Sequence, residues 1–298
     1  MAVTAGVDKL TAAQYNSIQT TIKTVLDYYG NTAASSQLTL PGTSTKITSA
    51  AWGNLRADIL KCNRHQQVSA GSLTNPTTDT KIAAADYNAY ETMANNCLTN
   101  YLLDSGNYST VSNLVTAVNT PGVSPGGYWG ATGQNTLRHS FLLTWASASA
   151  ANYFFNAGGQ IRVSSTLTGG TVATAGTKDY SWRSLILNTV GTQSFGYSTW
   201  TSLTGSNSRL YTVTSSTYNP NSFQIYANKS SANSIQFYVE WEDLNDPGGY
   251  GIDESVTATT TSIIEQYYAS GVNQVDVSGY LPTISQSALT PIPSPDPV

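Results

Sequence analysis

The chain has 298 residues, only 10% of them charged, and a formal net charge of −4. Charged residues make up about a quarter of an average globular protein, so this chain is unusually neutral, and Ser and Thr are abundant beside its 24 Gly and 19 Tyr. Without a run of Lys or Arg, the sequence lacks the electrostatic attraction that nucleic acid or an anionic membrane would require. We therefore expect neither as a partner.

A hydrophobic content of 40% is enough for ordinary cores, and the length permits two domains. The first ten residues lack the basic and apolar regions of a signal peptide. No apolar run reaches the roughly 18 residues of a membrane span. Cys62 and Cys97 are too few for a disulfide framework and lack metal-ligand spacing, which favours a reducing compartment of synthesis.

Three segments near the N-terminus share one pattern, a Lys followed six residues later by an aromatic residue. They are residues 9–15, 46–52 and 81–87, and their spacings of 37 and 35 residues lie in the range of helical repeats. In each, the residue after the Lys and the aromatic residue predict the hydrophobic staple of a helix start. Thr11, in a capping box with Gln14, and Thr48 supply N-caps, whereas Ala83 leaves the third start without one.

Apolar residues continue at helical spacing after each aromatic residue, which predicts three amphipathic helices. Cys62 and Cys97 fall on these stripes, so we expect both thiols to be small buried groups. His65 is expected to act as a helix C-terminal charge or polar contact. Since one such helix cannot bury its stripe alone, we expect a bundle, with a fourth helix near residues 108–118.

Beyond the Pro- and Gly-rich residues 120–127, short segments alternate apolar and polar side chains, which predicts antiparallel strands. These strands are expected at residues 137–145, 152–156, 160–167, 208–214, 222–229, 234–242 and 256–268. Gly158 and Gly159 predict a tight hairpin turn between two of them. Helical spacing over residues 179–189 predicts one helix packed on the sheets.

Residues 153–162, Tyr-Phe-Phe-Asn-Ala-Gly-Gly-Gln-Ile-Arg, resemble a β-rich module of tailed-bacteriophage virion proteins, often described as tail-fibre or structural proteins. In that module a strand ending in Phe-Phe-Asn leads through Gly-Gly into Ile-Arg. Further matches are the helix around Trp182, Tyr211, the strand 235–239 with Asp243, and residues 252–254. The resemblance covers about residues 137–285 and brings no catalytic residues with it.

The densest acidic stretch offers oxygen ligands of the kind that Ca²⁺ prefers. Its members are Asp243, Asn245, Asp246, Asp253 and Glu254. Their spacing does not match an EF-hand, and Asp and Asn are also the usual residues of turns. We therefore predict no metal site or cofactor, and keep a calcium loop as the alternative.

Glu240 and Glu242 lie two apart on a predicted strand, so they project to the same side, opposite Val239 and Trp241. Paired carboxylates could serve a retaining glycosidase, but we favour a solvated polar face opposite a buried one as their explanation. The sequence has no Gly-x-Ser-x-Gly or His-Glu-x-x-His motif, and His139 alone on a strand is expected to be a polar residue without a catalytic role.

Aromatic residues at loop-like positions are candidate contacts for a glycan or for another subunit, above all Trp200, Tyr218 and Tyr250. The strands predicted at residues 208–214, 222–229 and 256–268 carry few charges, and such strands are poorly protected against pairing when they lie at a sheet edge. These two features favour a homo-oligomer. A trimer is the first guess, because the fibres that the chain resembles tend to be trimeric.

The sequence thus predicts an α+β multidomain protein. An N-terminal helical-repeat bundle spans residues 1–119, a Pro/Gly linker 120–136, a jelly-roll-like antiparallel β-sandwich 137–290, and an extended Pro-rich tail 291–298. The resemblance implies a non-enzymatic structural component of a phage virion, a tail fibre or a fibre/baseplate-neck adaptor subunit, made in the host cytoplasm. Its partners would be copies of itself, other virion tail proteins and a host surface glycan. The alternatives are a receptor- or carbohydrate-binding adhesin module and a polysaccharide-degrading tail enzyme.

Overall fold

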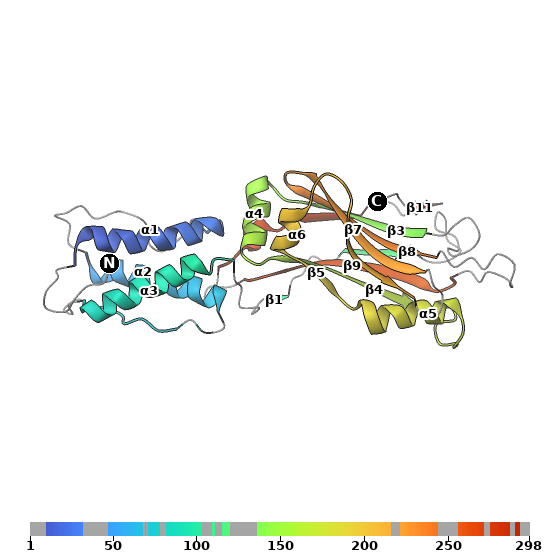
Figure 1. The fold of residues 1–298 in the computed structure, drawn as a ribbon, viewed down its shortest axis with the longest axis horizontal. Helices are drawn as coiled ribbons and strands as arrows, with labels where there is room; N and C mark the ends of the chain where they lie inside the picture. The colour runs from blue at the N-terminus through green and yellow to red at the C-terminus, as the bar shows by residue number, and fades with distance from the viewer. Residues whose placement is uncertain are drawn as a thin grey trace. The chain divides into compact units, whose positions relative to one another are not determined.

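The computed structural model describes residues 10–31, 47–67, 69, 71–77, 82–102, 109–110, 115–119, 136–215, 221–243, 256–270, 275–286 and 290–292. Within these residues the protein is a mixture of helices and antiparallel sheets (Figure 1). The chain divides into two compact units. The helical unit contains the described residues up to Thr110 together with Asn152–Gly159 and Tyr268–Leu281, and the β-rich unit contains the remaining described residues.

The three predicted N-terminal helices are α1 (Ala12–Tyr28), α2 (Ser49–Gln66) and α3 (Ala84–Thr99). Thr11 Oγ1 accepts a hydrogen bond from Gln14 N at 3.3 Å, and Gln14 Oε1 accepts one from Thr11 N at 2.9 Å, which completes a capping box. Thr48 Oγ1 accepts from Ala51 N at 3.2 Å, whereas Ala83 gives α3 no side-chain cap. The helix starts predicted from the sequence are therefore confirmed.

Aromatic residues on the stripes of the three helices pack against one another. The ring centroids of Tyr15 and Trp52 lie 4.8 Å apart and those of Trp52 and Tyr90 lie 5.1 Å apart, both edge to face. Such pairs contribute about 0.5–1.5 kcal/mol beyond the burial of their surface. Cys62 and Cys97 are unlinked and fully buried on the same stripes, as expected.

Two segments from later in the chain complete the helical unit. Asn156 Nδ2 donates to the Tyr28 carbonyl at 2.9 Å, and Tyr280 Oη donates to the Gly30 carbonyl at 2.5 Å. Gly30 has a φ of +71°, and a Cβ there would lie 2.4 Å from the Tyr153 ring, so both the backbone and the space require glycine. This unit is therefore discontinuous in sequence.

The domain boundaries predicted from the sequence, which divide the chain into residues 1–119, 120–136, 137–290 and 291–298, stay a prediction. Residues 120–135 and 293–298 lie outside the described residues. The short strand β1 (Ser109–Thr110) belongs to the helical unit, and β2 (Val115–Asn119) belongs to the β-rich unit.

Two antiparallel sheets make up most of the β-rich unit. In one sheet the described order is β9-β4-β5, with β2 also paired to β9. In the other the order is β10-β3-β8-β7-β6, with β11 also paired to β3. The strands are β3 (Thr136–Thr144), β4 (Gln160–Thr168), β5 (Gln193–Phe195), β6 (Ser208–Thr214), β7 (Ser222–Ser231), β8 (Ser234–Glu242), β9 (Thr259–Tyr268), β10 (Thr283–Gln286) and β11 (Thr290–Ile292).

Strands β6 and β8 have the bounds that the sequence predicted, and the predicted ends of β3, β4, β7 and β9 differ by a few residues. The predicted helix at 179–189 is also present, as α5 (Lys178–Leu185) followed by the π-helical turn η1 (Ile186–Val190). Further short helices are α4 (Ala148–Asn156), α6 (Tyr197–Ser202) and the 3-10 turn η2 (Ser278–Tyr280).

Two predicted elements are wrong. Residues 152–156 are the end of helix α4, which Ser147 caps by accepting from Ala150 N at 3.1 Å, so Gly158, with a φ of +76°, follows a helix and turns no hairpin. Residues 108–118 contain β1 and most of β2 in place of a fourth helix. There, pairing of Val115 with Ile264 on β9 decides the conformation.

Aromatic side chains from strands of both sheets contact one another. Phe195 on β5 lies 5.7 Å from Phe237 on β8, measured between ring centroids. Trp182 on α5 lies 5.6 Å from Trp241 on β8, and Phe223 on β7 lies 5.5 Å from the same ring. These aromatic side chains are buried and belong to the core of this unit, to which α5 contributes Trp182.

Candidate functional site

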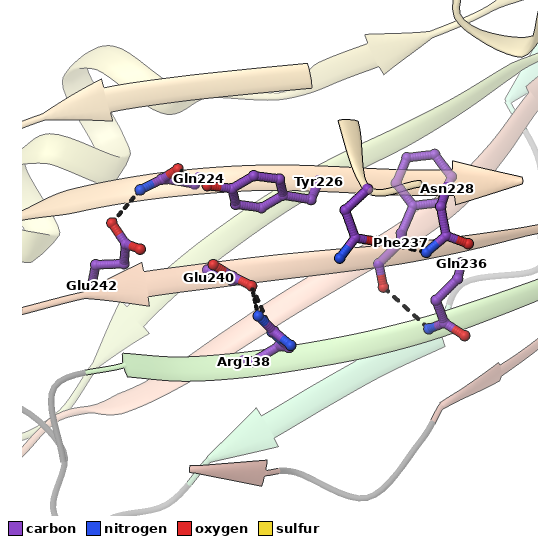
Figure 2. A network of polar contacts seen from close by, with 9 residues as sticks. Arg138, Gln224, Tyr226, Asn228, Gln236, Phe237, Glu240 and Glu242 are labelled. Atoms are coloured by element: carbon purple, nitrogen blue, oxygen red, sulfur yellow. Dashed lines mark hydrogen bonds and ion pairs between the residues drawn. The ribbon is translucent and has the colours of Figure 1, made fainter. Parts of the chain in front are cut away.

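Polar side chains gather on the face of the β3-β8-β7 strands that is opposite to the core, and Figure 2 shows this network. We call it the polar face, and it consists of Arg138, Ser222, Gln224, Tyr226, Glu240 and Glu242. The strand register explains the clustering, because Arg138 and Gln224 lie directly on either side of Glu240, and Ser222 lies beside Glu242. Alternation along each strand directs the intervening apolar side chains to the core.

Each carboxylate of the polar face has protein donors. Arg138 Nε and Nη2 both lie 2.5 Å from Glu240 Oε1, an ion pair between strands β3 and β8. Glu242 Oε2 accepts from Ser222 Oγ at 2.6 Å and also from Gln224 Nε2. The Arg138 guanidinium in turn lies 4.9 Å from the centre of the Tyr238 ring.

The expectation of a solvated polar face is wrong. Glu240 is 2% exposed and Glu242 is 3% exposed, and Arg138 is also buried. Burial and the charges of both glutamates raise the pKa of Tyr226, so its hydroxyl stays protonated and donates to Gln224 Oε1. The two carboxylates do share one side of β8, as predicted, but they are occupied by internal partners. This arrangement suits a structural network better than acid–base chemistry on a substrate.

The candidate calcium loop is described only at Asp243. Its Oδ2 lies 2.6 Å from Lys178 Nζ, and both side chains are buried. The carboxylate oxygen that a calcium ion would need is therefore already paired with the Lys178 ammonium group. Asn245, Asp246, Asp253 and Glu254 lie outside the described residues. Within the described part of the chain, no group of three or more His, Cys, Asp or Glu side chains could hold a metal ion.

Trp200 is 4% exposed and offers no open ring face for stacking on a sugar. Its ring centroid lies 5.8 Å from that of Trp145, and Lys229 Nζ lies 3.6 Å from its ring centre. Burial lowers the pKa of Lys229. The other two candidate contacts, Tyr218 and Tyr250, lie outside the described residues and stay predictions.

Both histidines are buried and neutral near pH 7. Burial lowers the pKa of His65 to about 4, with the Ala157 carbonyl opposing the shift, and its ring packs 4.8 Å from Tyr29. The alternative of a helix-end charge is therefore wrong for His65. His139 projects into the core of the β-rich unit, where burial lowers its pKa to about 4. Burial also raises the pKa of the Cys97 thiol to about 12, so this thiol is no nucleophile.

Sequence reasoning missed Asp179, whose carboxylate joins three segments. Its Oδ2 accepts from Thr171 N and Oγ1, both at 2.9 Å, and from Thr257 Oγ1 at 2.5 Å. Its Oδ1 accepts from Thr257 N at 2.9 Å and Ala258 N at 3.2 Å. Burial alone would raise the pKa of Asp179, but these hydrogen bonds outweigh it and lower the pKa. An acidic residue in the first turn of α5, eight residues after Gly170-Thr171, is the only signal that the sequence offers.

A groove of about 640 Å³ lies between the end of α2, residues 69–73 and α3. Its described lining is neutral and includes the amides of Asn63, Asn88 and Asn96 and the hydroxyls of Ser69 and Thr92. The described lining contains no Asp, Glu, His, Lys or Arg side chain.

No helix among the described residues is long and apolar enough to cross a membrane. In comparisons with known proteins, no family model, no curated protein and no solved structure matches this chain.

Proposed function

We propose that this protein is a non-enzymatic structural component of a bacteriophage virion, specifically a tail fibre or a fibre/baseplate-neck adaptor subunit. The observation that carries the proposal is the pairing of the buried carboxylates on the polar face. Glu240 and Glu242, the pair that a glycosidase would need, each accept hydrogen bonds from neighbouring side chains of the sheet. A polar network that is satisfied internally holds strands together, which is the role of a structural subunit.

The resemblance of residues 153–162 to phage virion modules supports the same assignment. In this chain the Phe-Phe-Asn part of the motif ends helix α4, whereas its Gln-Ile-Arg part begins strand β4. We therefore propose the motif as a helix-to-strand connection. Its Gly159 allows the close approach that this connection needs, since a Cβ there would lie 2.5 Å from the Phe154 carbonyl oxygen.

The proposed architecture has two parts. The helices α1–α3 would be a helical-repeat bundle that docks on the particle, because their starts recur at similar spacing along the chain. The two sheets would be a jelly-roll-like sandwich, since Phe195 and Phe237 bring their apolar faces together. The partners would be copies of the chain and other virion tail proteins, and the low charge would limit the desolvation required for their packing.

Mass spectrometry of gradient-purified virions tests the proposal. Peptides of this chain are expected at an abundance comparable to known tail proteins, and a host cytosolic protein serves as the contamination control. A chain found only at the level of that control would overturn the proposal. In a parallel assay, the purified protein incubated with host surface polysaccharide is expected to release no reducing ends. Release that is lost in the Glu240→Gln and Glu242→Gln variants would instead establish a glycan-degrading enzyme.

A further inference from the structure

Strand β6 lies at the end of its sheet, and among the described strands it pairs only with β7. Its sequence, Ser-Arg-Leu-Tyr-Thr-Val-Thr, contains one charge, at Arg209, and neither Lys nor Pro. Edge strands of soluble monomers usually carry Lys, Pro or several charges, because these residues prevent a second strand from pairing with the free backbone groups. By contrast, β7 and β9 are interior strands, so β6 is the only one of the three low-charge strands predicted for self-association that has such an edge.

The side chains of β6 are also incompletely covered. On the side of the polar face, Thr212 and Thr214 are exposed. On the core side, Tyr211 and Val213 are only half-buried, although they lie opposite fully buried residues of β7. A further strand beside β6 would satisfy its backbone groups and cover the apolar parts of both side chains.

We propose that β6 is a self-association edge, which pairs antiparallel with β6 of a second copy and joins the two sheets into one. An antiparallel edge is its own complement, because a two-fold axis places the donors of one copy opposite the acceptors of the other. The charges allow it. If Thr212 lies on the axis, Arg209 of each copy faces Ser215 of the other, which separates the two Arg209 residues by about 20 Å along the strands.

This inference rests on the proposed role as an assembling subunit and makes it more specific. A two-fold pairing closes as a dimer, so it replaces the trimer that the resemblance implied. The bulge between Arg209 and Tyr211 limits the regular part of the edge to residues 211–214, which identifies Thr212 and Thr214 as the positions to change.

The test uses two variants with opposite charges, Thr212→Lys with Thr214→Lys and Thr212→Glu with Thr214→Glu. Whether Thr212 or Val213 lies on the axis, like charges then face each other across the pair. The control, Thr168→Lys with Ser198→Lys, adds the charge of the Lys variant at exposed positions away from β6. Light scattering should give a dimer for the wild type and the control, and a dissociation constant at least about tenfold higher for each variant.

An equimolar mixture of the Lys and Glu variants should restore the dimer, because opposite charges then meet. Hydrogen exchange of the wild type should also show amides 211–214 becoming more protected as the protein concentration rises, a readout that needs no variant. A monomeric wild type, a dimer unaffected by either variant, or exchange independent of concentration would overturn the pairing. A trimer in solution would also overturn the β6 pairing, but it would not contradict the proposed virion role. Absence of the protein from virions would overturn the virion role, but it would not contradict the β6 dimer.

Discussion

The Asp179 carboxylate requires a glycine beside it. Comparing the adjacent glycines Gly169 and Gly170 separates the cost of backbone strain from the cost of steric overlap with this carboxylate. Gly169 and Gly170 both have positive φ, of +75° and +52°. A Cβ at Gly169 would meet nothing within 4 Å, whereas one at Gly170 would lie 2.5 Å from Asp179 Oδ2 and 2.6 Å from Ala258 N. We expect Gly169→Ala to destabilise the protein by about 1–2 kcal/mol through backbone strain. Gly170→Ala should lose about 1–3 kcal/mol more through overpacking.

Urea unfolding of both variants measures this difference, with Gly169→Ala as the matched control. Equal losses of unfolding free energy for the two substitutions would contradict the prediction. They would mean that the hydrogen bonds of Asp179 adapt to the added methyl group. The sequence could not have identified this cluster, because Asp179 and Thr257 are 78 positions apart and are brought together only by the tertiary fold.

The polar face illustrates the same limit for the candidate site. The period of two along β8 correctly predicted that Glu240 and Glu242 share one side. Their burial was missed, because it depends on Arg138, 102 positions away, and on Gln224 from another strand. Local pattern therefore predicts which way a side chain points, while its neighbours across the sheet determine what it can do.

The capping difference among the three helices predicts opposite effects of single substitutions. Thr11→Ala removes the capping-box acceptor of α1 and should cost about 1 kcal/mol. Ala83→Ser should stabilise the protein by a similar amount, because Ala83 is exposed and its φ of −73° and ψ of 154° already suit an N-cap. Thermal or urea unfolding of the helical unit measures both. Ala84→Ser, one residue inside the helix, is the control and should bring no gain.

Helices and strands in which apolar residues recur with one clear period were predicted correctly from the sequence. The prediction was wrong where a helical period and a strand period compete in the same segment. In residues 108–118, Val111, Leu114 and Val118 have helical spacing, yet Val118 belongs to β2, which pairs with β9. In residues 152–156 the run Tyr-Phe-Phe suggested a strand, but the preceding Ala-rich residues and the Ser147 cap form α4. Long-range pairing and a cap upstream of the segment decided these two cases.

The whole molecule carries a buried histidine in each compact unit, which makes both units sensitive to moderate acid. The pKa of His65 in the helical unit and that of His139 in the β-rich unit are each about 4, against about 6.5 in an unfolded chain. As the pH falls below about 6.5, the unfolded state binds these protons first. Stability should therefore be fully present above that pH, fall by about 3 kcal/mol per histidine down to pH 4, and lose nothing more from these groups below it.

His139→Leu isolates one of the two contributions. Neither ring nitrogen of His139 has a hydrogen-bond partner in the part of the chain that the structure describes, and its side chain lies on the same face as Leu137 and Phe141. Leucine should therefore fit without leaving a polar group unpaired. The variant should lose about half of the pH dependence that the two histidines together cause between pH 6.5 and 4, because His65 is then the remaining buried histidine. Urea unfolding at several pH values, followed by tryptophan fluorescence and circular dichroism, measures the slope. A slope equal to that of the wild type would show that protonation of His139 does not limit stability, and that other groups set the acid limit of the β-rich unit.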